Sequence, residues 1–210
     1  MKNSFAISRA REKALQLIQP AILMVIILLS GFNISNAQQY ENQYFERKGF
    51  FLGLGLGPGL ISYKRGYENN NSSFDRQNKI TFMSDFKIGY APTDHLAIYW
   101  MSKVAWFNLD RNFEDKNLYI NGLGGIGASY FVNKSAPSPY FNGGIGFSTF
   151  MPLIENDGVN FTGLGISAGA GYEFVSHWSA EINFTYGKPS YEGSYINIAA
   201  LRLTVNYLLY

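Results

Sequence analysis

Large apolar residues alternate with small or polar residues along most of the chain after residue 48. In residues 49–60, GFFLGLGLGPGL, a glycine occupies every second position from Gly53 to Gly57, and leucines stand between them. Alternation with a period of two places the glycines on one face of an extended strand and the bulky residues on the other. The segment therefore predicts a β-strand with one small and one bulky face.

The same glycines do not match a nucleotide-binding loop. The dinucleotide fingerprint is G-x-G-x-x-G, and its last position falls on Pro58 when counted from Gly53 and on Leu60 when counted from Gly55. No Lys-Ser or Lys-Thr pair follows, as a phosphate-binding P-loop would require. We therefore expect no nucleotide cofactor.

Eight segments with this alternation follow one another. They span approximately residues 49–60, 79–90, 96–107, 117–132, 139–151, 160–175, 178–187 and 195–209. Each has about ten residues or more, which exceeds a typical soluble strand and is enough to cross a bilayer. No segment after residue 37 has a helical period, so we expect an all-β fold.

The connections between these segments alternate in length. Tight turns fall at residues 91–95, 133–138 and 176–177, and longer polar segments fall at 61–78, 108–116, 152–159 and 188–194. Outer-membrane barrels alternate in this way, with short turns in the periplasm and long loops outside. The sequence therefore predicts an eight-stranded antiparallel up-and-down transmembrane β-barrel with both mature termini in the periplasm.

The two faces of each segment indicate which side meets lipid. In residues 178–187, Ile182 and Phe184 share one face, and Glu181 and Asn183 share the other. In several other segments the second face carries Gly, Ser, Asn or Ala instead of the Lys and Glu of a water-exposed surface. Because eight strands leave an interior just wide enough for side chains, we expect the bulky residues to face lipid.

Aromatic residues are expected in two belts at the membrane surfaces. The belt near the short turns comprises Tyr90, Tyr130, Tyr172, Trp178 and Tyr207, and the belt near the long loops comprises Phe82, Trp106, Phe150 and Tyr186.

The N-terminal segment has the features of an export signal. Basic residues precede an apolar run at 21–29, and Ser35-Asn36-Ala37 offers small residues for cleavage. The run is shorter than the roughly 20 residues that span a bilayer. We expect a signal peptide at 1–37, a polar tether at 38–48 and the barrel at 49–210, with a retained N-terminal anchor as the alternative.

Composition excludes several classes of function. Without the signal segment, acidic residues exceed basic residues by one, so no basic surface argues for nucleic acid. The chain has 0 cysteines, which excludes disulfides, thiol chemistry and cysteine metal ligands. We expect neither a metal nor a cofactor.

Two stretches resemble a known family. Residues 171–187, GYEFVSHWSAEINFTYG, combine a Gly-Tyr pair, a two-residue turn, a Trp-Ser pair and an alternating strand, and the chain ends on the strand ALRLTVNYLLY. These features resemble the small outer-membrane β-barrel proteins of the "porin family", which are related to the OmpA transmembrane domain. The resemblance implies the outer membrane of a Gram-negative bacterium, insertion by the barrel assembly machinery, and contact with outer-membrane lipid and lipopolysaccharide.

Charged residues of both signs fall on the predicted inner faces. They are Asp85, Lys87, Lys103, Glu173, Glu181 and Arg202. Unpaired charges in a narrow interior cost several kcal/mol, so we expect these residues to pair. Glu181 and Arg202 lie on neighbouring predicted strands and form the most specific expected pair. The charges form either a gate on a conduction path or a structural plug, which the narrow lumen of eight strands favours.

An enzyme is the competing class of function. Outer-membrane lipid A deacylases have a similar size and use a His-x-Ser pair with an acid, a pattern that His177, Ser179 and Glu181 match. The site of that family lies toward the outer leaflet, whereas His177 falls in a predicted periplasmic turn. We therefore expect no enzymatic activity.

The longest polar segment, residues 61–78, is a candidate extracellular recognition loop. Its candidate contact residues are Tyr63, Lys64, Arg65, Tyr67, Phe74 and Arg76. Exposed loops on rigid scaffolds commonly carry recognition, although the Asn/Ser tract is equally consistent with a solvated loop. The sequence therefore predicts an outer-membrane barrel with a structural role, or with a surface role toward an unknown ligand or protein. A narrow channel for small solutes and a lipid A hydrolase remain the alternatives.

Overall fold

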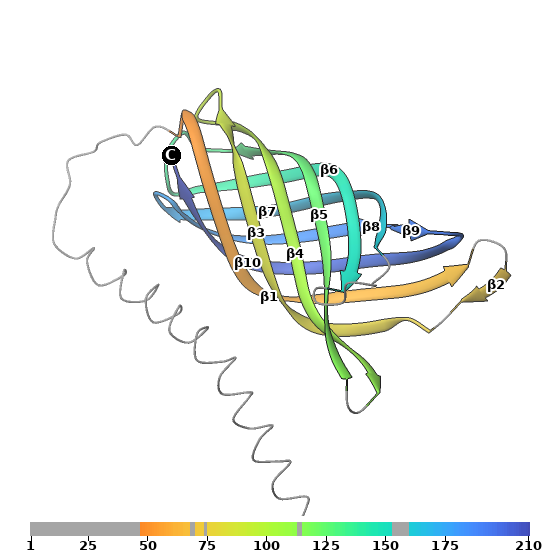
Figure 1. The fold of residues 1–210 in the computed structure, drawn as a ribbon. Coiled ribbons are helices and arrows are strands. Elements are labelled where there is room, and N and C mark those ends of the chain that lie inside the picture. Colours follow the sequence, from red (N-terminus) through yellow and green to blue (C-terminus); the bar gives the residue numbers. More distant parts are fainter. Residues whose placement is uncertain (1–46, 68–69, 74, 113–114, 153–159) are drawn as a thin grey trace, which may run out of the picture. The chain divides into compact units, whose positions relative to one another are not determined.

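The described part of the chain is built from antiparallel strands (Figure 1). The computed structural model describes residues 47–67, 70–73, 75–112, 115–152 and 160–210. The expected signal peptide and most of the expected tether lie outside these residues.

Eight strands are long. They are β1 (Gly49–Tyr67), β3 (Gln77–Ala91), β4 (Leu96–Asn112), β5 (Asp115–Phe131), β6 (Ser138–Pro152), β7 (Phe161–Val175), β8 (Trp178–Gly187) and β10 (Ser194–Leu209). Two are short, β2 (Asn70–Ser73) and β9 (Ser190–Tyr191). No helix within the described ranges is long and apolar enough to cross a membrane.

The eight long strands close into a barrel. Each pairs with the next in the order β1-β3-β4-β5-β6-β7-β8-β10, and antiparallel pairing of β1 with β10 closes the sheet. The short β2 adds to β1, and β9 pairs with β7 and β10. This topology confirms the predicted all-β, eight-stranded antiparallel up-and-down barrel.

The alternation along β1 separates lipid-facing from lumen-facing residues. Leu54 is 53% exposed, whereas Gly53 and Gly55 on either side of it are buried. Gly55 lies opposite Asn206 of β10, and a Cβ atom on Gly55 would overlap the Asn206 side chain. The glycines therefore form the inner wall because the interior has no room for larger side chains.

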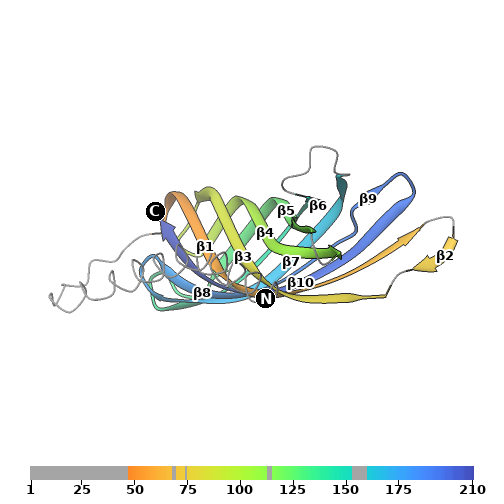
Figure 2. The same cartoon turned by 60° about the horizontal axis from the view of Figure 1, so that its bottom comes forward.

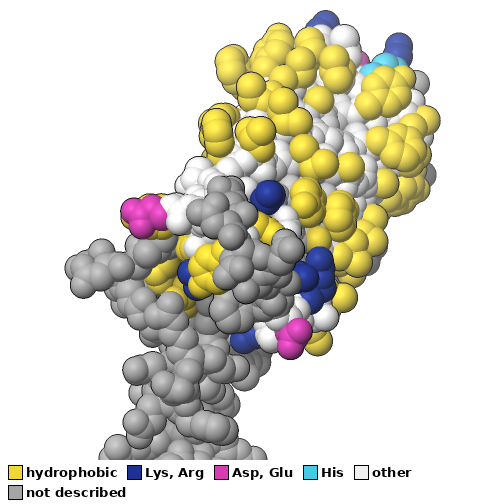
Figure 3. Space-filling view, turned by 90° about the vertical axis from the view of Figure 1, so that its right-hand side faces the viewer, with side chains coloured by type: hydrophobic (Ala, Val, Ile, Leu, Met, Phe, Trp, Pro, Cys, Tyr) yellow, Lys and Arg dark blue, Asp and Glu magenta, His cyan; other side chains and the backbone are white. Residues whose placement is uncertain are grey.

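The outer surface of the barrel is apolar. Ile80, Ile145 and Leu164 are each more than two thirds exposed, and similar residues cover every long strand. Figure 3 shows hydrophobic side chains over much of the visible side of the barrel, with charged side chains nearer its ends. A closed sheet with an apolar exterior is the architecture of a transmembrane β-barrel, because closure leaves no unpaired strand edge in the lipid.

The strands extend further than expected at the long-loop end (Figure 2). β1 continues to Tyr67 and pairs with β10 as far as the Tyr67–Ser194 pair, so residues 61–67 are strand and not loop. The hydrogen-bonded ladder between β3 and β4 ends at the Phe82–Trp106 pair, although β3 begins at Gln77 and β4 runs to Asn112.

One aromatic assignment is wrong. Phe150 was expected in the lipid-facing belt, but it is 6% exposed and packs inside the barrel. Outward residues of β6, such as Ile145 and Phe147, have odd numbers, so the alternation of this strand turns Phe150 inward. Other residues of the expected belts, including Tyr90, Tyr130, Phe82 and Tyr186, are exposed on the outer surface.

Candidate functional site: the barrel interior

A cluster of charged side chains crosses the middle of the lumen. This central charge cluster consists of Asp85, Lys87, Lys103, Glu181 and Arg202, and each member is at most 4% exposed. Lys87 Nζ lies 2.6 Å from Glu181 Oε2, and Lys103 Nζ lies 3.1 Å from Glu181 Oε1. Lys103 Nζ also lies 2.7 Å from Asp85 Oδ2, and Arg202 Nη1 lies 3.4 Å from Asp85 Oδ1.

The strand register explains how these residues meet. Asp85 and Lys103 are direct neighbours across β3 and β4. Glu181 is on β8, which β1 and β10 separate from β3, so its contact with Lys87 reaches across the lumen. The ion pairs of Glu181 with Lys87 and Lys103 therefore reach across the lumen and fill the space between its walls.

The expected pair between Glu181 and Arg202 is not the one that forms. The register places Arg202 opposite Asn183 and places Glu181 opposite Thr204, so the two charges are offset along the strands. Arg202 instead donates to Asp85 and to the backbone carbonyl of Val104. The sequence correctly placed Glu181 and Arg202 on neighbouring strands. The strand register and the contacts across the lumen give each of them a different partner.

The central charge cluster carries more cations than carboxylates. Glu181 additionally accepts a hydrogen bond from the Tyr140 hydroxyl at 3.0 Å, and the same hydroxyl lies 3.1 Å from Ser179 Oγ. Two nitrogen atoms of Arg202, Nε and Nη2, have no hydrogen-bond partner within the described part of the chain. The carboxylates are therefore each shared between cations, and removing one leaves buried positive charge without compensation.

Arg47 closes the short-turn end of the lumen. It is 2% exposed, its guanidinium contacts Glu173, and it also donates to the backbone carbonyls of Asp94 and Asn133. The guanidinium carbon lies 4.3 Å from the centre of the Phe131 ring. Glu173, expected in the inner network, thus belongs to a separate pair at this end. Arg47 was expected only as part of the polar tether.

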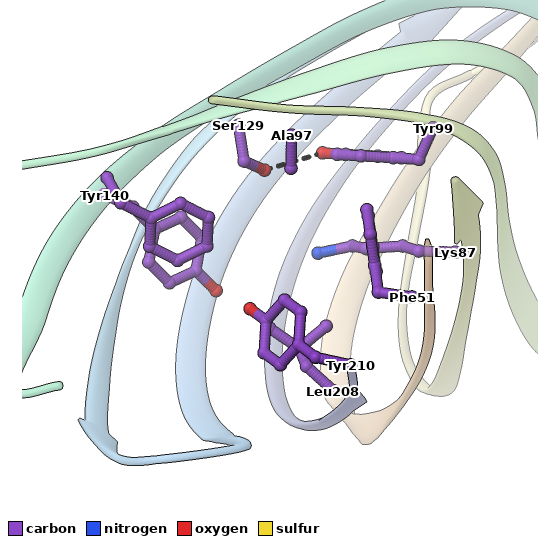
Figure 4. A pocket seen from close by; sticks show the side chains of 9 residues that line it. Phe51, Lys87, Ala97, Tyr99, Ser129, Tyr140, Leu208 and Tyr210 are labelled. Atoms are coloured by element: carbon purple, nitrogen blue, oxygen red, sulfur yellow. Dashed lines mark hydrogen bonds between the residues drawn. The ribbon is translucent and has the colours of Figure 1, made fainter. Parts of the chain in front are cut away.

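A cavity of about 10 Å³ lies between Arg47 and the central charge cluster. Figure 4 shows the hydroxyl groups of Tyr99, Ser129, Tyr140 and Tyr210 and the amine of Lys87 among its lining. Such a volume is comparable to that of about one water molecule. The space is therefore too small for an organic ligand.

Aromatic side chains fill the lumen at the long-loop end. The Phe150 ring lies 5.6 to 6.4 Å, centre to centre, from the rings of Tyr63, Phe107, Tyr119 and Phe161. All five are at most 9% exposed. Together with the central charge cluster and Arg47, they form three successive layers that occupy the interior.

The residues of the hydrolase alternative lie near the short-turn end. Ser179 is fully buried, with its hydroxyl next to that of Tyr140. His177 lies in the turn between β7 and β8, and its Nδ1 is 2.6 Å from the backbone carbonyl of Leu208. Glu181 is occupied by the central charge cluster.

The candidate recognition residues divide between two surfaces. Tyr63 points into the aromatic layer, and Arg65 lies 5.7 Å from the Phe161 ring centre above that layer. Lys64 lies between Tyr63 and Arg65 on β1, so its side chain is on the opposite, outer face, which it shares with Leu60. Arg76 is exposed and donates to Ser62 Oγ at 3.0 Å. Tyr67 ends β1, and Phe74 lies outside the described residues.

Comparison with known proteins finds similarity in structure. No family model matches the chain, and no curated protein matches its sequence. The attachment invasion locus protein Ail of Yersinia pestis, solved with the heparin analogue sucrose octasulfate, is 11% identical, covering 77% of this chain and 99% of that chain, with a TM-score of 0.48. Neisserial surface protein A is 13% identical over 77% and 96% of the two chains, with a TM-score of 0.47.

A further similar structure is the outer membrane protein OprG from Pseudomonas aeruginosa. It is 13% identical, covering 80% of this chain and 99% of that chain, with a TM-score of 0.45. The pairing of the eight long strands establishes the closed barrel within the chain itself.

Proposed function

We propose that the protein is an integral outer-membrane barrel that is closed to solutes, has no enzymatic activity, and serves a structural or surface-binding role. The filled interior carries this proposal. Lys87 and Lys103 meet Glu181 across the lumen, the Phe150 layer lies on one side, and Arg47 lies on the other. A path for solutes would have to break ion pairs in a low-dielectric space, which costs several kcal/mol.

The lengths of the connections support a proposed orientation of the barrel in the membrane. β1 begins and β10 ends at the end that carries the short turns (Figure 1). Because short turns face the periplasm in outer-membrane barrels, the proposed orientation has the start of β1 and the end of β10 on the periplasmic side. The opposite end carries the extended parts of β1, β4, β5 and β10, which are long enough to project beyond the membrane.

These extensions support a surface role. Beyond the membrane, β1 stays paired with β10 and with β2, so the residues from Tyr63 to Tyr67 are held on a sheet instead of a loose loop. A rigid support reduces the ordering cost of binding. The same proposal has outer-membrane lipid and lipopolysaccharide around the barrel and the barrel assembly machinery as the route of insertion.

Planar-bilayer recordings on the purified, lipid-reconstituted chain test the closed state. We expect a heat-dependent shift in gel mobility, which reports a folded barrel, without discrete conductance steps. Conductance steps that change with Glu181→Ala, but not with Lys134→Ala in the exposed β5–β6 turn, would show that the lumen is a channel. Release of fatty acid from lipid A, lost on Ser179→Ala, would show a hydrolase.

A further inference from the structure

Three cations lie on the outer surface of the barrel at its long-loop end. Lys64 on β1, Arg76 before β3 and Lys188 after β8 lie along the part of the wall formed by β3, β1, β10 and β8, and we call these three residues the cationic arc. Lys188 Nζ lies 4.3 Å from the centre of the Tyr195 ring, and Tyr195 is opposite Gly66 on β1. Arg76 is held by Ser62, two residues before Lys64.

The cationic arc lies just beyond the lipid-facing surface. The exposed phenylalanine and leucine side chains of β1 run from Phe50 to Leu60. Ten residues on a strand tilted by about 40° rise about 25 Å, which matches the apolar band of outer-membrane barrels. Lys64 is the second outward position after Leu60, and it lies about 10 Å beyond Leu60 on the same estimate. A lysine side chain can extend its amine back toward the headgroup layer.

The three cations have no carboxylate partner within the described part of the chain. The hydrogen bond of Arg76 goes to a hydroxyl, and the contact of Lys188 is with an aromatic ring. Asp75, next to Arg76 in the sequence, is exposed, and Glu192 accepts a hydrogen bond from the Tyr191 hydroxyl and raises the pKa of that hydroxyl. The positive charge of the arc is therefore available to an external anion.

We infer that the cationic arc binds the phosphate-bearing headgroup of an outer-leaflet lipid, whose acyl chains lie against Leu60, Phe184 and Leu201. These three residues are exposed on β1, β8 and β10, the strands that carry or flank the arc. Phosphate contributes the negative charge, and the apolar wall below contributes the contact with hydrocarbon. The inference rests on the membrane orientation proposed above.

Native mass spectrometry of the detergent-solubilised chain with bisphosphorylated lipid A tests the site. We expect one lipid to bind preferentially, and we expect affinity to fall about fivefold for each cation changed to glutamine, or roughly a hundredfold for the Lys64→Gln/Arg76→Gln/Lys188→Gln variant. Lys134→Gln, at the opposite end, should bind as the parent does. Dephosphorylated lipid A should bind as weakly to the parent as the phosphorylated lipid does to the triple variant.

Three results would overturn the assignment. They are equal binding of phosphorylated lipid A by the parent and the triple variant, competition by millimolar inorganic phosphate alone, and arc-dependent binding of a lipid-free acidic polysaccharide. Heat-modified gel mobility of each variant separates this inference from the proposed function. A folded barrel that fails to select phosphorylated lipid contradicts the site, whereas a chain without the mobility shift contradicts the membrane barrel itself.

Discussion

Glu181 is the residue on which the central charge cluster depends most. Its two carboxylate oxygens contact different lysines, Lys87 and Lys103, and it also accepts the Tyr140 hydroxyl. Neutralising it would leave two ammonium groups close together in a dry interior. Breaking a buried pair from one side costs about 3–5 kcal/mol, more than replacing both partners, because the remaining charge stays buried.

A double-mutant cycle can measure this dependence. Glu181→Gln should lower the free energy of unfolding by about 3–5 kcal/mol in urea titrations of the lipid-reconstituted barrel, followed by gel mobility. In a Lys87→Met background the same change should cost less, because Lys103 keeps its contact with Asp85 and the cation that depends on Glu181 is gone. Equal costs in both backgrounds would mean that Lys87 and Glu181 do not interact energetically.

The alternation of residues predicts side-chain direction better than it predicts partners. All six charges expected inside are buried, because strict alternation fixes the face once one face is apolar. Arg47 was not expected inside the barrel. Its position is an even number of residues before the inward-facing Phe51 and Gly53, so extending the alternation toward the N-terminus would have predicted an inward side chain. The partners of Arg202 could not be predicted, because contacts across a lumen depend on register and barrel closure.

At the scale of single elements, the cores of the strands were predictable and their outer ends were not. The Asn- and Ser-rich composition of residues 61–78 is typical of a loop, but β1 runs through half of it. The reason lies in the partner strand. β10 places Ile198 opposite Tyr63 and Ile196 opposite Arg65, so pairing continues beyond the point where β1 has apolar alternation of its own.

The glycine face of β1 allows a matched pair of substitutions. Gly55→Val should destabilise the barrel by about 1–3 kcal/mol or more, because its side chain would overlap Asn206, while Leu54→Val on the lipid face should cost less than about 1.5 kcal/mol. Urea titration of both variants in the same lipid gives the comparison. If the two variants unfold at the same urea concentration, the inner wall is not tightly packed.

At the scale of the whole molecule, the barrel sorts its surface into lipid-facing and water-facing zones. The chain has 0 native cysteines, so single-cysteine variants can carry a spin label without background. Labels at Leu54 and Ile182 should be accessible to oxygen dissolved in lipid, and labels at Lys64 and Arg76 should be accessible to a water-soluble nickel complex. The reverse pattern would contradict the transmembrane assignment.

The end of the β3–β4 ladder also limits how far the membrane can extend along this side of the barrel. Past the Phe82–Trp106 pair, Lys79 Nζ bonds to the Asn108 carbonyl at 2.5 Å, and the Thr81 hydroxyl bonds to the Trp106 carbonyl. Beyond the Phe82–Trp106 pair, the contacts between β3 and β4 are thus made by side chains instead of by paired backbone groups. We call this part of the boundary between the two strands the seam. Hydrocarbon does not tolerate bare peptide groups, so the seam must stay in contact with water. On this side of the barrel we therefore expect the hydrocarbon layer to end near the Phe82–Trp106 pair.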